Sequence, residues 1–382
     1  MARLTALREE RPPYGAVPVH VWWRLVAIAR DVLARSGTLD GVQRARASRG
    51  ERRRSGRVLS LAPAILSSVA ERHPELGSES WRADVLLPTL SDVAVFMVGP
   101  PEDPFEAVVM VAETPAAAEG IQWQETALSA LHDDQRLGEW RSLLPEVLDT
   151  GTIEGTHYLI EKHVRGMTLE QAVTKPASRD GALRAAADAI HRLHHATAGE
   201  ATVDQAMLER LVLGPVGEVA RLAEHARVRP ASLAALARLS DELCTALEGQ
   251  TLALSWAHGD FAPGNILADA DGRITGILDW EFAHPQGLPA LDIVFFLLTA
   301  RVYARRQELG RVVRDLVVPK PVWSPAEAEL IAATAGASIG FERLALLSWL
   351  HHAAQMITRC TRYVDSGLWI HSNIRVVLDS LA

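Results

Sequence analysis

The spacing of hydrophobic residues becomes that of a β-sheet near residue 81. The stretch ADVLLPTLSDVAVFMVGPPEDPFEAVVMVAE (83–113) holds three short apolar runs separated by proline and aspartate. Runs of this length between turn residues predict three antiparallel strands, with a turn at GPPEDP. A helix over TPAAAEGIQWQETALSALHDD (114–134) and a further strand over THYLIEKHV (156–164) follow. We therefore expect a small sheet that ends near residue 163.

Beyond that sheet the apolar spacing is mostly helical. One predicted helix face carries Leu183, Ala187, Ile190 and Leu193. The pair Thr168 and Gln171 has the spacing of a capping box, and so does the pair Ser324 and Glu327, which indicates two helix starts. The chain after residue 163 is therefore predicted to be a larger, mostly helical domain.

Residues 1–80 predict a separate helical extension. VWWRLVAIARDVLARSG (21–37) has helical apolar spacing and ends at a glycine. The run RARASRGERRRSGR (44–57) is interpreted as a basic linker, with a docking patch for an acidic partner as the alternative. The sequence thus predicts an α+β chain in three parts, at 1–80, 81–163 and 164–382.

Composition excludes several classes of protein. The formal net charge is −8, which argues against a general nucleic-acid binder. The longest apolar runs are shorter than the roughly 20 residues of a membrane-spanning helix, so no membrane span is expected. Cys244 and Cys360 could form at most one bridge, and the N-terminal residues do not resemble a signal peptide. We expect a cytoplasmic protein without disulfides, and the oligomeric state stays open.

The stretch HGDFAPGNILADADGRITGILDWEFA (258–283) carries the candidate chemistry. Asp271 and Gly272 form a two-residue hairpin signal, and this turn would place Asn265 opposite Leu278. Asp279 then lies one residue beyond that pair, close to the loop that carries Asp260. One carboxylate and one amide oxygen suit Mg²⁺, which completes its shell with water and substrate phosphates. The alternative is an acidic surface hairpin beside a glycine-rich loop.

These residues resemble the aminoglycoside phosphotransferase and choline kinase group, small-molecule relatives of protein kinases. The catalytic loop of that family is matched by His258, Gly259, Asp260 and Asn265, and its metal motif by Leu278, Asp279, Trp280 and Glu281. The resemblance implies a bilobal kinase-like fold, with a sheet lobe at 81–163 and a helical lobe at 164–382. It further implies that Asp260 is the catalytic base, that His258 supports the loop, and that Asn265 and Asp279 hold Mg²⁺. Asp292 resembles the structural aspartate behind the loop.

The family's nucleotide-holding lysine is missing. Such a lysine ends the third strand and pairs with a glutamate of the next helix, whereas here Met110 stands at that position and Glu125 is the expected partner. The chain has three lysines, and none precedes Lys162. Arg82, or backbone amides near Ser91, are the alternatives for holding the phosphates. The segment 159–164, with Glu161 and His163, is the expected adenine-binding hinge for ATP or GTP.

The acceptor pocket is expected between the catalytic loop and the C-terminal helices, where SWLHHAAQMITRCTRYVDSGLWIHSN (348–373) gathers polar-tipped aromatic residues. Its predicted residues are Glu281, Trp349, His352 and Trp369. We favour a kinase that phosphorylates a hydroxyl of an aminoglycoside-like, sugar or nucleoside compound. The alternatives are a pseudokinase used for binding or scaffolding, and a kinase-fold enzyme acting on a peptide side chain in a natural-product pathway.

Overall fold

The computed structural model describes residues 60–87, 91–101, 105–317, 323–334 and 339–382. The predictions for residues 1–59 lie outside this range. The described chain forms two compact units. A small unit contains the described residues up to Glu113 together with Leu148–His163, and a large unit contains Thr114–Val147 and Val164–Ala382. The predicted boundary near residue 163 coincides with a change of unit, whereas the helix at 114–134 belongs to the large unit.

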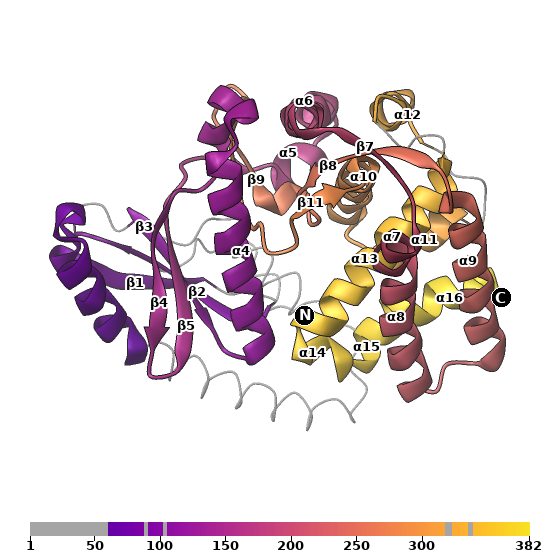
Figure 1. Cartoon of the computed structure of the whole chain (residues 1–382), viewed down its shortest axis with the longest axis horizontal. Coiled ribbons are helices and arrows are strands. Elements are labelled where there is room, and N and C mark those ends of the chain that lie inside the picture. Colours follow the sequence, from indigo (N-terminus) through magenta and orange to yellow (C-terminus); the bar gives the residue numbers. More distant parts are fainter. Residues whose placement is uncertain (1–59, 88–90, 102–104, 318–322, 335–338) are drawn as a thin grey trace, which may run out of the picture. The chain divides into compact units, whose positions relative to one another are not determined.

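The small unit is built on a five-stranded sheet in the order β1-β2-β3-β5-β4 (Figure 1). Its strands are β1 (Arg82–Leu87), β2 (Val93–Gly99), β3 (Ala107–Ala112), β4 (Val147–Ile153) and β5 (Thr156–Lys162). The pairs β1·β2, β2·β3 and β3·β5 are antiparallel, which confirms the predicted strands. We did not predict β4, whose sequence VLDTGTI has few apolar residues.

The helical residues 60–72 cover one face of this sheet. Their buried residues Leu61, Ile65 and Val69 recur at helical spacing and share one core with Phe96 and Val109 of the sheet. Two 3-10 turns, Pro74–Leu76 and Ser78–Ser80, lead from the helix to β1. This packing corrects the boundary predicted after residue 80, because the helix supplies part of the hydrophobic core of the sheet.

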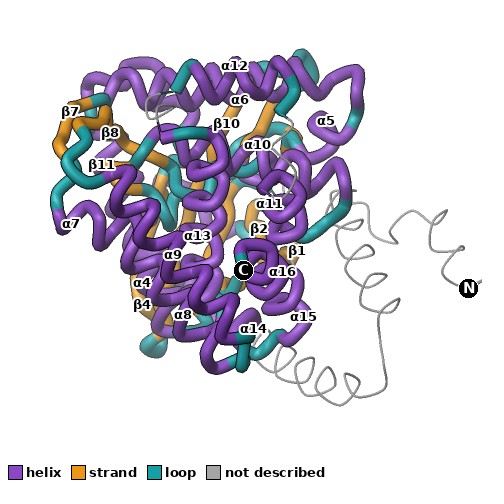
Figure 2. The backbone as a smooth tube through the Cα atoms, turned by 90° about the vertical axis from the view of Figure 1, so that its right-hand side faces the viewer, coloured by secondary structure: helices purple, strands orange, loops and turns teal. Residues whose placement is uncertain are grey.

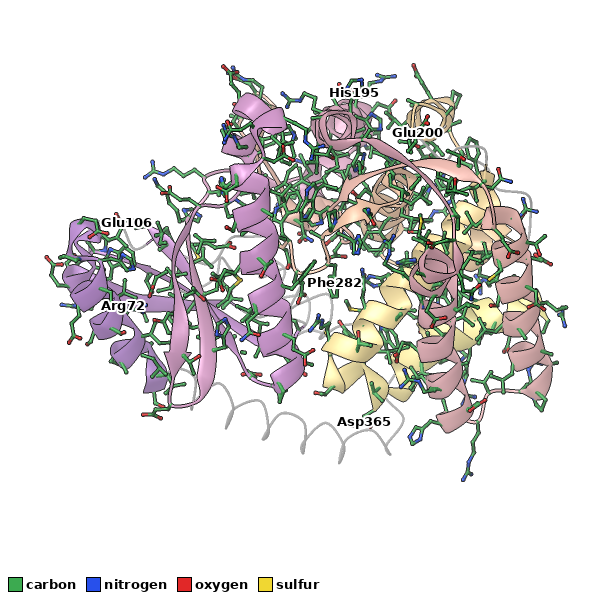
Figure 3. The ribbon with its side chains drawn as sticks, in the orientation of Figure 1. Arg72, Glu106, His195, Glu200, Phe282 and Asp365 are labelled. Carbon is green, nitrogen blue, oxygen red and sulfur yellow. The ribbon has the colours of Figure 1, made fainter. Side chains whose placement is uncertain are left out.

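Arg72 ties the end of this helix to the sheet. Its guanidinium donates to Asp149 Oδ2 of β4 at 2.6 Å and also to the Tyr158 hydroxyl of β5. The same hydroxyl donates to Asp149 Oδ2 at 3.0 Å. Figure 3 labels Arg72 in this unit. The buried carboxylate is therefore paired, as a charge inside a core must be.

The large unit is mostly helical (Figures 1 and 2). Its longer helices are α4 (Pro115–Asp133), α6 (Pro176–Thr197), α8 (Gly214–His225), α9 (Pro230–Leu247), α10 (Pro289–Arg305), α11 (Leu309–Val317), α12 (Pro325–Ala332) and α13 (Phe341–Arg359). Shorter helices are α5 (Glu170–Thr174), α7 (Gln205–Leu208), α14 (Thr361–Val364), α15 (Gly367–Trp369) and α16 (Val376–Leu381). The large unit also has 3-10 segments (Gln135–Leu143 and Pro263–Asn265) and two π-helical segments (Glu209–Leu213 and Ile370–Arg375).

Helix α10 forms the centre of the large unit. It is buried along most of its length and contacts α5, α6, α11 and α13. The predicted face of α6 points into the same core, since Leu183, Ala187, Ile190 and Leu193 are all buried. The apolar spacing of α6 therefore predicted its buried face correctly.

Two three-stranded sheets also belong to the large unit, in the orders β10-β9-β6 and β11-β8-β7. Their strands are β6 (Met167–Thr168), β7 (Gly199–Thr202), β8 (Thr251–Ala257), β9 (Ile266–Ala268), β10 (Ile274–Ile277) and β11 (His284–Gly287). The hairpin β9–β10 was predicted, and the other four strands were missed.

One of the two predicted capping boxes forms. The Ser324 side chain accepts from the Glu327 amide, and the Glu327 side chain accepts from the Ser324 amide. The capping box predicted at Thr168 was wrong, because Thr168 lies in β6 opposite Leu267 and helix α5 begins after Leu169 without a side-chain cap. In the part of the chain that the structure describes, no helix has the length and apolar character needed to cross a bilayer.

Candidate active site

The loop 258–265 joins β8 to β9 and turns sharply at Gly259. The φ angle of Gly259 is 79°, a conformation that glycine adopts without strain. A Cβ atom built on Gly259 would lie 2.2 Å from the carbonyl oxygen of Phe282. Two peptide segments therefore approach each other at a distance that only glycine allows, which explains the break in regular structure before Asp260.

Asp292, at the start of α10, holds this loop by hydrogen bonds to its backbone. Its carboxylate accepts from the backbone amides of His258 (2.8 Å) and Gly259 (2.9 Å), and it lies 2.9 Å from His194 Nε2. Burial raises the pKa of Asp292, but hydrogen bonding and the charge of His194 outweigh burial, and the net shift is downward. The geometry agrees with the predicted role of Asp292. Sequence reasoning missed His194, which lay in the motif HRLHHA without a visible partner.

His258 is a structural residue of the loop. Its Nε2 donates to the Leu278 carbonyl at 2.9 Å, and its Nδ1 accepts from the Asp260 amide at 3.2 Å. The ring is fully buried and lies 4.6 Å from the Trp280 ring. Burial lowers the pKa of His258, which keeps the ring neutral. His258 thus connects the loop to the hairpin.

The hairpin has the predicted register at its open end and a different turn at its tip. The Leu278 amide donates to the Asn265 carbonyl at 2.8 Å, as expected. At the tip, Asp269 pairs with Arg273 and Gly272 has a φ of 82°, which is a three-residue loop rather than the predicted two-residue turn. A register shift between Ile274 and Gly276 compensates for the extra residue. Asn265 and Asp279 therefore still reach the same end of the hairpin.

Asn265 holds the Asp260 carboxylate. Its Nδ2 donates to Asp260 Oδ2 at 3.0 Å and to the Asp260 carbonyl at 2.9 Å. With the nitrogen directed at Asp260, the Oδ1 atom of Asn265 is the one that can face a cation. The same side chain can thus orient the predicted base and contribute an oxygen ligand.

Asp279 and Glu281 place two further carboxyl groups beside this pair. Asp279 has a φ of 68°, which is uncommon for a residue other than glycine, and burial raises its pKa to about 6. Burial, followed by the charges of Asp279 and Asp260, raises the pKa of Glu281 to about 8. Glu281 also lies against α4, where a Cβ on Gly120 would be 2.5 Å from Glu281 Oε2. A bound cation would favour the ionised form of both carboxyl groups.

The donor set fits Mg²⁺. Among the described residues, no group of three or more His, Cys, Asp or Glu side chains is arranged to hold a metal ion. Mg²⁺ does not need such a cage, because one or two carboxylates with waters and substrate phosphates complete its octahedron. Asp279 and the Asn265 amide oxygen supply hard oxygen ligands of this type. We therefore retain them as candidate ligands.

Helix α13 lies against the loop 258–265. His352 Nδ1 is 3.9 Å from Asp260 Oδ1, and Gln355 Nε2 donates to the Gly259 carbonyl at 3.1 Å. Burial lowers the pKa of His352 to about 4, so the ring is neutral. Further along α13, Arg359 donates to the Ala116 carbonyl of α4 at 2.6 Å. The sequence identified His352 but not Gln355 or Arg359, because their loop and helix partners are distant in the chain.

Two other predicted acceptor residues do not reach the loop in this way. Trp349 is fully buried and donates to the Asn373 carbonyl at 2.7 Å, so it belongs to the core and cannot line a pocket. Trp369 is half-buried and packs against Tyr363, with ring centroids 5.1 Å apart. The contacts described for Trp369 lie within the C-terminal segment and do not place it beside Asp260.

The predicted nucleotide residues divide between the two units. Met110 of β3 pairs with Leu159 of β5, and Val108 pairs with Glu161. These residues share the sheet face opposite Val109, which packs on the helical residues 60–72.

The remaining predicted nucleotide residues have these positions. Ser91 lies just before β2, and the His163 amide, just after β5, donates to Glu106. Glu125 belongs to α4 of the large unit, and its pairing with a residue of β3 stays a prediction. Arg82 donates to the carbonyls of Ser80 and Trp81.

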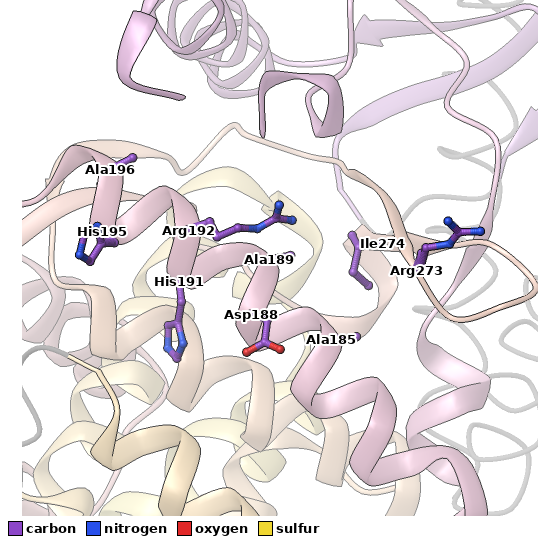
Figure 4. Close-up of a pocket in the computed structure, with 9 residues that line it drawn as sticks. All are labelled: Ala185, Asp188, Ala189, His191, Arg192, His195, Ala196, Arg273 and Ile274. Carbon is purple, nitrogen blue, oxygen red and sulfur yellow. The ribbon is translucent and has the colours of Figure 1, made fainter. Parts of the chain in front are cut away.

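A cavity of about 720 Å³ lies between α6 and the hairpin in the large unit (Figure 4). It is lined by Ala185, Asp188, Ala189, His191, Arg192, His195, Ala196, Arg273 and Ile274. Figure 4 shows the Arg192 side chain extending from α6 toward Ile274. None of the predicted site residues lines this cavity, so we do not assign the acceptor to it.

Several solved structures are similar to this chain. Aminoglycoside phosphotransferase APH(2'')-Ib with ADP bound has 15% identity over 81% of this chain and 97% of that chain, with a TM-score of 0.48. Aminoglycoside phosphotransferase APH(3'')-Id from Streptomyces rimosus, in complex with ADP and streptomycin, has 17% identity over 75% and 97%, with a TM-score of 0.46. A glucosamine kinase has 16% identity over 79% and 92%, with a TM-score of 0.36. No curated protein matches the chain.

A family model provides the assignment. The model described as the phosphotransferase enzyme family, APH, matches residues 90–328. This range includes the loop 258–265, the hairpin and Asp292, and it covers more than half of the chain. The motif resemblance and the family match agree, and the chain belongs to the APH phosphotransferase enzyme family.

Proposed function

We propose that this protein is a Mg²⁺-dependent kinase that transfers the γ-phosphoryl group of a nucleoside triphosphate to a hydroxyl group of a small molecule. The observation that carries the proposal is the arrangement around Asp260. Asn265 donates to its carboxylate, His258 accepts from its amide, and Asp292 accepts from the loop amides of His258 and Gly259. ATP is the first nucleotide to test, with GTP as the alternative. Aminoglycoside-like, sugar and nucleoside compounds are the candidate acceptors.

In this proposal Asp260 orients the acceptor hydroxyl and takes its proton. The hydroxyl oxygen forms a bond to the γ-phosphorus, the bond from that phosphorus to the bridging oxygen breaks, and the nucleoside diphosphate leaves. General-base help of this kind is worth roughly 10²- to 10⁴-fold in rate. Asn265 fixes the direction of the carboxylate, which reduces the orientational cost of the step.

Asp279 and Asn265 are the proposed Mg²⁺ ligands. When bound, Mg²⁺ would neutralise charge on the phosphates of the nucleotide. Asp279 supplies the carboxylate and Asn265 the amide oxygen. Glu281, held against α4, adds a further carboxyl group, which a bound divalent cation would keep ionised.

A pseudokinase is the second candidate, and Met110 is the observation that favours it. Without a cation at that position of β3, the small unit lacks one charge that kinases use to hold phosphates. Such a protein would bind Mg²⁺-nucleotide weakly, or without turnover. An enzyme acting on a peptide side chain remains a third proposal, and a peptide acceptor would distinguish it.

The test uses the full chain, Mg²⁺ and γ-labelled ATP or GTP with a panel of aminoglycosides, amino sugars, sugars, nucleosides and serine-containing peptides. We expect label transfer by the wild type and a loss of at least about 100-fold in Asp260→Asn, which keeps the shape but removes the base. Asp271→Asn is the matched control, because it makes the same change at the exposed hairpin tip.

Three results would overturn the assignment of Asp260. These are full turnover by Asp260→Asn, an equal loss in Asp271→Asn, and a wild type that binds Mg²⁺-nucleotide but transfers nothing to any acceptor or to water. The third result would favour the pseudokinase. Thermal unfolding of both variants checks that the fold is intact.

A further inference from the structure

Helix α13 holds two polar atoms that are buried without a partner beside the catalytic loop. His352 Nδ1 and Gln355 Oε1 are both inaccessible to solvent, and neither makes a hydrogen bond in the described structure. The great majority of buried polar atoms are hydrogen-bonded, and a side-chain atom left without a partner costs about 1–3 kcal/mol. Two such atoms one helical turn apart therefore require an explanation.

Both side chains contact consecutive residues of the loop. Gln355 donates to the Gly259 carbonyl at 3.1 Å, and His352 Nδ1 lies 3.9 Å from Asp260 Oδ1. This second distance is longer than a hydrogen bond, but no other group of the described chain lies close enough to satisfy Nδ1. A movement of about 1 Å would bring them to hydrogen-bonding distance.

The ring faces Asp260 in a way that selects one tautomer. Because Nδ1 lies 3.9 Å from a carboxylate oxygen, a proton on Nδ1 is attractive and a bare lone pair is repulsive. The ring is also held from another side, since its centroid lies 4.9 Å from that of Phe295 in α10. The other Asp260 oxygen, Oδ2, already accepts from Asn265.

We propose that His352 is a positioning residue for Asp260: its Nδ1–H closes onto Asp260 Oδ1 when nucleotide and acceptor are bound. This inference rests on the proposed function of Asp260 as the base. The carboxylate is then held at both oxygens, by Asn265 at Oδ2 and by His352 at Oδ1. Residue 352 lies beyond the 90–328 segment that matches the family model, so this support comes from a part of the chain that the match does not cover.

The test separates positioning from packing by changing the ring. His352→Phe keeps an aromatic ring against Phe295 but removes Nδ1, and His352→Asn keeps a nitrogen donor at the δ position. The readout is phosphate release from Mg²⁺-ATP with water as acceptor, which does not depend on the identity of the acceptor. We expect His352→Phe to lower kcat by about 10- to 100-fold, as misplacement of a catalytic group does. The KM for ATP should stay within about twofold.

We expect His352→Phe to lower activity without lowering stability. His352→Phe removes an unpartnered buried nitrogen, so its melting temperature should not fall, whereas a purely structural role would make activity follow stability. His352→Asn should recover most of the lost kcat. His351→Phe is the matched control, because the adjacent His351 is bonded to the Leu211 carbonyl at 2.8 Å and its loss should lower stability without changing kcat.

Asp260→Asn in the same assay separates the proposed role of Asp260 as the base from the proposed role of His352 as a positioning residue. If Asp260→Asn retains full hydrolysis, the proposed function fails and this inference fails with it. If Asp260→Asn is inactive while His352→Phe keeps the wild-type kcat, only this inference is overturned. A second readout is ¹⁵N-histidine NMR with Mg²⁺ and a non-hydrolysable ATP analogue, where we expect the Nδ1–H tautomer of His352. A bare Nδ1 would contradict the proposal.

Discussion

The hairpin β9–β10 of the large unit and the sheet face around Met110 in the small unit differ in how they use polar groups. In the hairpin region, Asp292, His258 and Asn265 each hold a neighbouring backbone or side chain by a hydrogen bond. On the sheet face, the position expected for a lysine is occupied by Met110, between paired strands. The large unit thus contains the residues proposed for phosphoryl transfer, and the small unit has the strand framework with Met110 at the position expected for a lysine.

This difference has a structural cause. The register of β3 depends on backbone pairing and on the core formed by its other face, where Val109 packs with the helical residues 60–72. A side chain on the opposite face can change without disturbing that core. Asp292, in contrast, accepts two backbone amides and contacts His194, so the loop depends on it directly. The two regions should therefore respond differently to substitution.

The largest expected effect is that of Asp292→Ala. Removing the carboxylate leaves the amides of His258 and Gly259 without acceptors and His194 without its partner, which costs about 3–5 kcal/mol. Urea unfolding at pH 7 measures the loss. Asn at this position keeps an oxygen acceptor and should lose less than Ala. An unchanged free energy of unfolding in Asp292→Ala would show that the loop does not depend on this residue.

The pH dependence of stability tests the same contact. Because the net pKa of Asp292 is lowered in the folded protein, its contribution to stability is present above the usual carboxyl pKa of about 4 and is lost as pH falls through the lowered value. The difference in unfolding free energy between wild type and Asp292→Asn should therefore shrink below about pH 4. A difference that stays constant down to pH 2 would argue that the charge of Asp292 is not what matters.

The next effect concerns the metal. Asp279→Asn removes the carboxylate that we assign to Mg²⁺ and should weaken Mg²⁺-ATP binding by about 1.5–3 kcal/mol, or roughly 10- to 100-fold. Isothermal titration calorimetry with and without Mg²⁺ measures it. The loss should disappear when EDTA removes Mg²⁺, and Asp271→Asn should bind as the wild type does. Equal Mg²⁺-ATP affinity in wild type and Asp279→Asn would remove Asp279 from the metal site.

The sequence predicted the hairpin end of the site because register follows from the turn and from alternation. Asn265 and Leu278 are paired as expected, although the tip has one more loop residue and a compensating shift. Strand β8 was missed, although its apolar run TLALSWA directly before His258 is a signal that could have found it. Local pattern indicates an element, and it often indicates which face is buried.

Pattern cannot say which distant element covers that face. The sequence did not show that residues 60–72 pack on the sheet, because the periodicity of Leu61, Ile65 and Val69 gives a helical face without its partner. Trp349 and His352 lie in one helix and both seemed suitable for a pocket, yet one is in the core and the other faces Asp260. Gln355 became visible only through its bond to Gly259.

The smallest effect, and the one that tests the small unit, is that of Met110→Lys. The introduced ammonium group would lie on the same sheet face as Glu161, diagonally across the β3–β5 pair, within reach of a long side chain. If the small unit still holds phosphates, the new charge should tighten Mg²⁺-ATP binding by about 1 kcal/mol, or about fivefold. Val108→Lys is the matched control, because it places the same charge on the same face two residues along the strand, opposite Glu161, and an equal gain there would mean a general electrostatic effect. If the face serves another purpose, the ammonium group is desolvated among apolar strand residues, stability falls, and affinity does not rise. Calorimetry and thermal unfolding of both variants separate these outcomes: tighter binding in Met110→Lys alone supports a kinase that lacks one phosphate contact, whereas a destabilised variant that ignores ATP and GTP supports the pseudokinase.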